Sequence, residues 1–197
     1  MLNLITLEFS STKLDDYVQA PAIVYDLDWV ELAWPPEMRE VTFDECQNVT
    51  KCNYPKVQKY VLASVAGCYT DFHIDMCGTS VWYHVNTGKK YFWLAPPTPE
   101  NLKVFERWTR SKNQHEVFLG DLLQQPACQV VEVSQGQTLM LPSGWIHAVY
   151  TAENSIVFGG NFLNSLSIHS QIQVMNMEER FNMPKRYRFP CYEKLAQ

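Results

Sequence analysis

The feature that most constrains the fold of this chain is a series of short runs rich in apolar, aromatic and β-branched residues. Each run ends at proline, glycine or polar turn residues, and no repeat or low-complexity tract interrupts the series. Many short strands joined by turns are typical of a β-sandwich or a small barrel. Asn86-Thr87-Gly88 separates two of the runs and predicts a short hairpin connection. The predicted strands cover residues 2–9, 56–65, 79–85, 90–94, 130–133, 138–141, 146–150 and 155–158.

Two helices are predicted outside this β-rich core. Thr98 can cap the first helix, and Pro99 suits its first helical position. The apolar face of this helix is predicted to consist of Leu102, Phe105 and Trp108. The second helix follows the last predicted strand and ends before Pro184. Its apolar face is predicted to consist of Ile168, Ile172 and Met175. The pattern therefore predicts a mainly β, double-sheet core with added α-helices.

Length and charge bound the number of domains and the kinds of partner. A chain of 197 residues with 46% hydrophobic residues can bury one sizeable core, so residues 1–197 are predicted to form a single domain. The abrupt apolar start suggests that this domain is a fragment of a longer protein. No apolar run reaches the roughly 18–20 residues of a membrane-spanning helix, so no membrane partner is expected. The net charge of −5 argues against direct nucleic-acid binding, despite one small basic group at Lys185, Arg186 and Arg188.

A metal site is indicated by two histidines and one aspartate. His73 and Asp75 are two residues apart, and side chains at this spacing on an extended chain project from the same face. This pair alone is weak evidence, because H-x-D is common by chance. A third ligand must come from a distant strand, and His147 follows the turn Pro142-Ser143-Gly144. Two histidines and a carboxylate on one face of an octahedral Fe(II) leave three positions open, as a non-haem iron oxygenase requires.

The other histidines and a neighbouring aspartate are not predicted to bind metal. His84 alternates with aromatic residues on a predicted strand, while His115 and His169 lie in polar or helical surroundings, so core or surface roles are expected for all three. Asp71 lies two residues before His73, farther along the same strand, and is interpreted as structural.

Five blocks of sequence, in the same order, resemble the Jumonji-C (JmjC) histone lysine demethylases. They cover residues 54–60, 67–73, 78–84, 142–150 and 158–163. The segment 92–98, Phe-Trp-Leu-Ala-Pro-Pro-Thr, resembles the subgroup that acts on lysine 36 of histone H3 more than the sister plant-homeodomain-finger subgroup. The resemblance implies a jelly-roll fold, that is, a cupin-like double-stranded β-helix core with added helices.

The resemblance also implies a cofactor and roles for further residues. The family uses Fe(II), with 2-oxoglutarate and O2 as cosubstrates. Lys90 would pair with the distal carboxylate of 2-oxoglutarate, and Thr70 would donate a hydrogen bond to the same carboxylate. Tyr83 and Asn3 would lie near the cosubstrate or the methylated lysine, and Asn161 would lie near the substrate pocket.

The activity implied by the resemblance is hydroxylation of the N-methyl group of mono- or dimethyl-lysine on a histone H3 tail in the nucleus. The products would be formaldehyde, succinate, CO2 and the demethylated lysine. Three alternatives stay open at this stage. The chain could act on lysine 9 or 27 of histone H3, it could be a JmjC protein hydroxylase, or it could be a catalytically silent binding module.

Two departures from the family pattern bear on the shape of the site. Met76-Cys77 stands where Phe-Gly is common, directly after Asp75, and Ala66 stands where an arginine is common. A thiol at Cys77 near a redox-active iron would be an oxidation site if it were exposed; otherwise it is a small packing residue.

Overall fold

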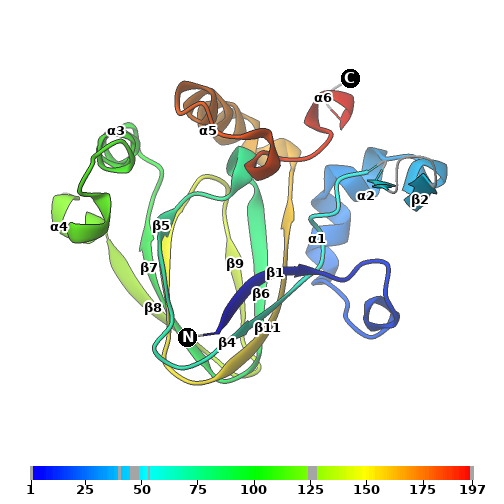
Figure 1. The fold of residues 1–197 in the computed structure, drawn as a ribbon, viewed down its shortest axis with the longest axis horizontal. Coiled ribbons are helices and arrows are strands. Elements are labelled where there is room, and N and C mark those ends of the chain that lie inside the picture. The colour runs from blue at the N-terminus through cyan, green and yellow to red at the C-terminus, as the bar shows by residue number, and fades with distance from the viewer. Residues whose placement is uncertain (1, 40, 45–48, 53, 124–127, 196–197) are drawn as a thin grey trace.

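Two antiparallel β-sheets form the body of the protein and face each other in Figure 1. The computed structural model describes residues 2–39, 41–44, 49–52, 54–123 and 128–195. The five-stranded sheet contains, in spatial order, β1 (Asn3–Glu8), β4 (Tyr60–Ser64), β11 (Ser155–Phe162), β6 (Ser80–Thr87) and β9 (Thr138–Leu141). The four-stranded sheet contains β5 (Tyr69–His73), β10 (Ile146–Thr151), β7 (Lys89–Ala95) and β8 (Gln129–Ser134). A separate pair consists of β2 (Val41–Asp44) and β3 (Val49–Cys52).

The order of strand pairing confirms the predicted fold class. Strand β4 pairs with β11, β5 with β10, β6 with β9, and β7 with β8, all antiparallel. The chain thus forms one long nested hairpin whose strands pass from sheet to sheet, with β4 and β6 in one sheet and β5 and β7 in the other. This winding is a double-stranded β-helix, or jelly roll. Between the sheets lies a hydrophobic core made of Tyr83, Val85, Phe92, Leu94, Val133, Leu141 and Val157.

The predicted hairpin at Asn86-Thr87-Gly88 is wrong in one respect. The connection is short, but β6 and β7 belong to different sheets and do not pair with each other. Gly88 has a φ of +87°, and a Cβ at this position would collide with the carbonyl oxygen of Asn154. Gly88 therefore allows the chain to turn tightly from one sheet into the other. The chain must cross here because both strands direct an apolar face toward the shared core.

The helices lie outside the sheets, as predicted. They are α1 (Ala22–Leu27), α2 (Trp29–Ala33), α3 (Pro99–Thr109), α4 (Leu119–Leu122), α5 (Ile168–Arg180) and α6 (Tyr192–Leu195). Figure 1 shows α3 and α5 at the same end of the sandwich. The prediction for α3 is confirmed, because Thr98 caps it by accepting a hydrogen bond from Asn101 N, and Phe105 and Trp108 are buried. No helix in the described part of the chain is long and apolar enough to cross a membrane.

The helix α5 is present, but its predicted buried face is wrong for two of the three residues; only Met175 packs against a hydrophobic cluster. Ile168 and Ile172 are 42% and 49% exposed, whereas Val174 and Met177 are buried. The inward face also contains the polar side chains of Gln171 and Glu178. The face is set by the turn after β5, against which α5 packs and which offers a backbone N–H to Glu178. Gln171 donates instead to Asn164 O, just before the helix. A search for apolar periodicity alone cannot find such a face.

Candidate metal centre

His73, Asp75 and His147 converge at one end of the four-stranded sheet. His73 ends β5, His147 is the second residue of β10, and the register of these strands places the two histidines opposite each other. Asp75 lies two residues beyond His73 and has an extended backbone. The imidazole ring centroids are 4.1 Å apart, and Asp75 Oδ2 is 3.7 Å from His147 Nε2. The potential ligand atoms of the three residues all lie within 4.8 Å of one another.

Backbone carbonyls orient both imidazole rings. His73 Nδ1 lies 2.8 Å from Asp71 O, and His147 Nδ1 lies 3.1 Å from Trp145 O. When Nδ1 carries the proton, it donates to the carbonyl and leaves the Nε2 lone pair directed away from the strand. Burial, followed by the proximity of His73, holds the pKa of His147 well below its ordinary value. His147 is therefore neutral at physiological pH, which is the form that binds metal.

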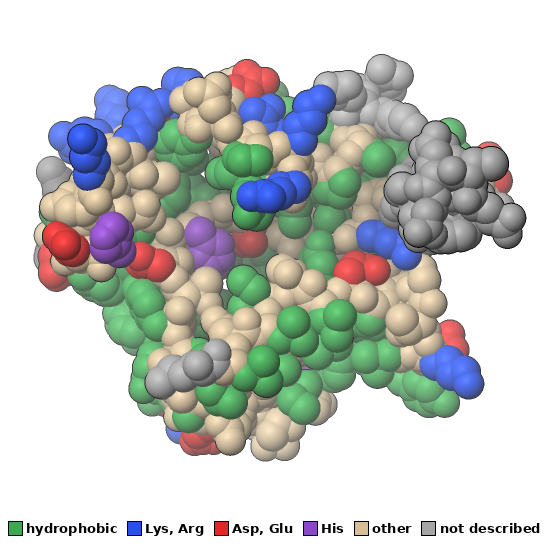
Figure 2. Space-filling model, viewed as in Figure 1, with side chains coloured by type: hydrophobic (Ala, Val, Ile, Leu, Met, Phe, Trp, Pro, Cys, Tyr) green, Lys and Arg blue, Asp and Glu red, His purple; other side chains and the backbone are tan. Residues whose placement is uncertain are grey.

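This ligand set is suited to an open iron site. Two imidazoles and one carboxylate match the donors of non-haem Fe(II) oxygenases, and three protein ligands leave room for other ligands. The three side chains line a cavity of about 250 Å³ whose walls are mainly apolar. Figure 2 shows a histidine side chain in a hollow on this face of the molecule.

The same cavity contains a buried lysine. Lys90 on β7 is only 2% exposed, and its Nζ donates a hydrogen bond of 2.7 Å to Thr151 Oγ1. Burial lowers the pKa of Lys90 to about 8, and among the described residues no carboxylate forms an ion pair with it. A buried ammonium without an anionic partner is costly, so this end of the cavity suits an anionic ligand.

Thr70, Asn3 and Tyr83 also line this cavity. Asn3 Nδ2 donates to Thr70 Oγ1 at 3.5 Å, and Ser64 Oγ donates to Asn3 Oδ1 at 2.8 Å. Tyr83 is buried, and its ring meets that of Phe92 edge to face with centroids 5.0 Å apart. The structure thus brings all the residues that the sequence predicted around the cosubstrate into one cavity with the three potential metal ligands.

Comparison with known families identifies the chain. Residues 60–162, more than half of its length, match the model of the family described as "JmjC domain, hydroxylase". The chain belongs to the JmjC family. The resemblance seen in the sequence is thereby confirmed at the level of the family.

The curated relatives of this JmjC chain are named as demethylases. It is 48% identical over 196 residues to "Lysine-specific demethylase 2A" of Xenopus tropicalis and 47% identical over 196 residues to "Lysine-specific demethylase 2B" of Mus musculus. It is also 48% identical over 196 residues to "Histone lysine demethylase PHF8" of Danio rerio. These alignments cover 100% of the chain but only 17%, 15% and 18% of the relatives. The chain therefore spans less than a fifth of the length of these proteins.

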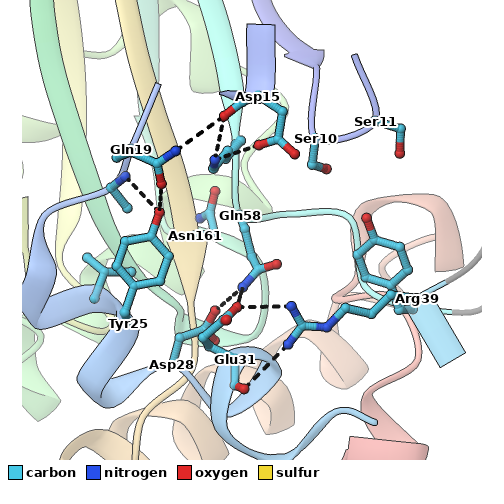
Figure 3. A pocket seen from close by; sticks show the side chains of 14 residues that line it. Ser10, Ser11, Asp15, Gln19, Tyr25, Asp28, Glu31, Arg39, Gln58 and Asn161 are labelled. Carbon is cyan, nitrogen blue, oxygen red and sulfur yellow. Dashed lines mark hydrogen bonds and ion pairs between the residues drawn. The ribbon is translucent and has the colours of Figure 1, made fainter. Parts of the chain in front are cut away.

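Asn161 on β11 lines both the cavity that contains the potential metal ligands and a second, polar cavity of about 410 Å³. Its Nδ2 donates to Thr79 Oγ1 at 2.9 Å. Figure 3 shows the second cavity, in which Gln58 donates to Asp28 at 2.6 Å and Arg39 pairs with Glu31 at 3.1 Å. Because the carboxylates of Asp28 and Glu31 already have partners, the network is interpreted as a structural link between α2 and the segment before β4.

The two departures from the JmjC pattern lie beside the cavity and on the surface. Met76 lines the cavity beside the potential metal ligands. Cys77 has a φ of +54°, a conformation that glycine adopts without strain, which agrees with the glycine that the family resemblance implies at this position. The thiol is buried, and burial raises its pKa to about 12, so the condition of exposure for an oxidation site is not met. Ala66 is exposed, and its N–H donates to Asn154 Oδ1 at 2.9 Å.

The histidines set aside in the sequence lie outside the group of potential ligands. His84 Nδ1 is 2.8 Å from Thr138 Oγ1, and His115 and His169 are exposed. Asp71 accepts a hydrogen bond from Phe72 N, which agrees with a structural role.

Two partners of the JmjC site were missed by sequence reasoning. Thr151 and Ser64 bind the side chains of Lys90 and Asn3. Each is the cross-strand neighbour of the residue it binds, so only the register of strand pairing could have revealed it.

Proposed function

We propose that this chain is the catalytic domain of an Fe(II)- and 2-oxoglutarate-dependent demethylase of methylated lysine on histone H3. The observation that carries the proposal is one cavity that contains an open set of two histidines and a carboxylate together with a buried lysine that has no carboxylate partner in the described part of the chain. A metal and a dianionic cosubstrate would satisfy both features at once. Residues 1–197 would form a single catalytic unit within a longer chromatin protein.

His73, Asp75 and His147 are the proposed iron ligands. When bound, Fe(II) with 2-oxoglutarate and O2 supplies the oxidising chemistry that hydroxylates an N-methyl group, with succinate, CO2 and finally formaldehyde as products. The protein holds the neutral imidazoles by their Nδ1 contacts and supplies the negative charge of Asp75. The negative charge of Asp75 would offset part of the positive charge of the metal ion.

Lys90 and Thr70 are the proposed anchor for the distal carboxylate of 2-oxoglutarate. Among the described residues the Lys90 ammonium donates to a hydroxyl and to no carboxylate, so a carboxylate ligand would gain a charge-assisted hydrogen bond in a dry environment. Tyr83 and Asn3 would orient the cosubstrate or the methylated lysine. Asn161 would contact the substrate, since it lies between the apolar cavity and the polar one.

The proposed substrate is mono- or dimethyl-lysine 36 of the histone H3 tail, and the proposed location is therefore the nucleus. A basic histone tail complements the net charge of −5. The relatives named 2A, 2B and PHF8 are 48%, 47% and 48% identical, so identity does not separate the lysine-36 subgroup from its sister. The proposal of lysine 36 rests on the resemblance of segment 92–98.

Mass spectrometry of methylated histone H3 peptides incubated with the protein, Fe(II), ascorbate and 2-oxoglutarate tests the function. The panel carries mono-, di- and trimethyl-lysine at positions 9, 27 and 36. Stepwise loss of methyl groups with release of formaldehyde is expected for mono- and dimethyl-lysine 36. His73→Ala should abolish this turnover, and His84→Ala, a histidine outside the site, should retain it.

Other outcomes would assign the chain to a different class. A stable product heavier by one oxygen, without formaldehyde, identifies a protein hydroxylase. Demethylation at lysine 9 or 27 instead would change the proposed substrate and leave the proposed reaction unchanged. A protein that binds neither Fe(II) nor 2-oxoglutarate is a silent binding module, and equal activity of His73→Ala would refute the ligand assignment.

A further inference from the structure

The turn that follows Asp75 is held by a buried carboxylate of α5. The N–H of Cys77 donates a 2.6 Å hydrogen bond to Glu178 Oε1, and Glu178 is only 7% exposed. This bond fixes a residue in the left-handed conformation, which is strained for a residue other than glycine. The turn is also closed from within, because Gly78 N donates to Asp75 O at 3.0 Å.

The turn that precedes His147 is tied to the turn after Asp75. Ser143 Oγ donates a 2.5 Å hydrogen bond to the carbonyl oxygen of Gly78, and both residues are buried. The residues joined by this bond lie far apart in the sequence. The backbone segments that carry Asp75 and His147 are therefore linked directly.

A second residue of α5 packs against both turns. A Cβ built on Gly78 would lie 3.1 Å from the Val174 side chain, and one built on Gly144 would lie 3.6 Å from it. Val174 and Glu178 are four residues apart, so they project from the same face of the helix. One turn of α5 therefore contacts the segments on either side of the candidate metal centre.

We propose that α5 positions the metal centre, with Glu178 as a positioning residue that fixes the turn after Asp75 and, through Ser143 and Val174, the turn before His147. This inference rests on the proposed function, because it assumes that His73, Asp75 and His147 bind metal. Glu178 does not contact the metal itself; it acts by holding the backbone that aims a ligand. This role explains why a carboxylate occupies a buried position at which a packing role alone would favour an apolar side chain.

Titration of the full chain with Co(II), followed by its visible absorption bands, tests the inference without turnover. Glu178→Ala removes the acceptor, and by analogy with other partners of metal ligands we expect about tenfold weaker Co(II) binding with altered bands. Glu178→Gln keeps an oxygen acceptor and should stay within about threefold of the unsubstituted protein. Glu179→Ala, an exposed neighbour on α5, is the matched control and should bind Co(II) normally.

Thermal unfolding of each metal-free variant separates positioning from folding. If Glu178→Ala is folded and binds Co(II) with unchanged affinity and bands, the inference is overturned while the proposed function stands. If Glu178→Ala does not fold, Ser143→Ala takes its place, with about fivefold weaker binding expected from the loss of one hydrogen bond. Unchanged binding by that variant would overturn the inference equally. If the unsubstituted protein does not bind Co(II), both the inference and the metal site of the proposed function fail.

Discussion

Replacing Lys90 by methionine should stabilise the protein in the absence of 2-oxoglutarate while removing its ability to bind that cosubstrate. Methionine has a similar length and carries no charge. Lys90 is almost fully buried, has no anionic partner among the described residues, and has a pKa lowered by burial from 10.5 to about 8. The folded state therefore carries an ammonium ion at pH 7 at a cost that only a ligand can offset.

The magnitude follows from the difference in pKa between the folded and unfolded states. A lowering of the pKa of Lys90 to about 8 corresponds to a penalty of about 3 kcal/mol at pH 7. The lost hydrogen bond to Thr151 reduces the gain by about 1–2 kcal/mol. We expect a net increase of about 1–2 kcal/mol in the free energy of unfolding, or about 2–8 °C in Tm for a chain of this size.

The pH dependence provides the internal check. The folded pKa lies below the unfolded one, so the penalty in the unsubstituted protein is complete below pH 8 and fades as the pH rises from about 8 to 10.5. Thermal and urea unfolding of metal-free protein at pH 7 and pH 10 should therefore show a large advantage of Lys90→Met that shrinks at the higher pH. Calorimetric titration should show 2-oxoglutarate binding weakened at least about thirtyfold by Lys90→Met.

Lys89 is the matched control on the other face of the same strand. It is partly exposed and pairs with Glu132 at 3.4 Å, so Lys89→Met should leave both stability and 2-oxoglutarate binding nearly unchanged. A Lys90→Met variant that is less stable than the unsubstituted protein at pH 7, or whose stability difference does not depend on pH, would refute the reasoning.

The remaining predictions concern the fold and are measured by thermal or urea unfolding. Gly88→Ala should destabilise the protein by at least about 2 kcal/mol, because strain at a positive φ adds to a collision with Asn154. Gly136→Ala has a similar φ of +82° but no atom within 4 Å of its Cβ, so it should cost only about 1 kcal/mol; equal losses would contradict the proposed collision. Phe105→Ala in the core under α3 should cost about 3–5 kcal/mol. Ile172→Ala on the exposed face of α5 should cost less than about 0.5 kcal/mol. A large loss of stability would instead support the buried face that the sequence predicts.

Local features of the sequence were sufficient to predict the elements and part of the site. Turn residues and β-branched runs located most of the strands, and Thr98-Pro99 located the start of α3. The two-residue spacing of His73 and Asp75 predicted that these side chains would lie together, because it depends only on the geometry of an extended chain. The blocks of family resemblance identified the JmjC family from contiguous residues alone.

Tertiary structure decided whatever depends on pairing between segments distant in sequence. The register of β10 against β5 brings His147 opposite His73, and the register against β7 gives Lys90 its partner Thr151. The crossing at Gly88 and the inward face of α5 could not be predicted locally, because both depend on which surfaces must be buried together. The sequence by itself determined which chemical groups are present and their local spacing. Only the packing of the two sheets and α5 brings those groups together in one cavity and excludes water from Lys90, because burial is a property of the assembled chain.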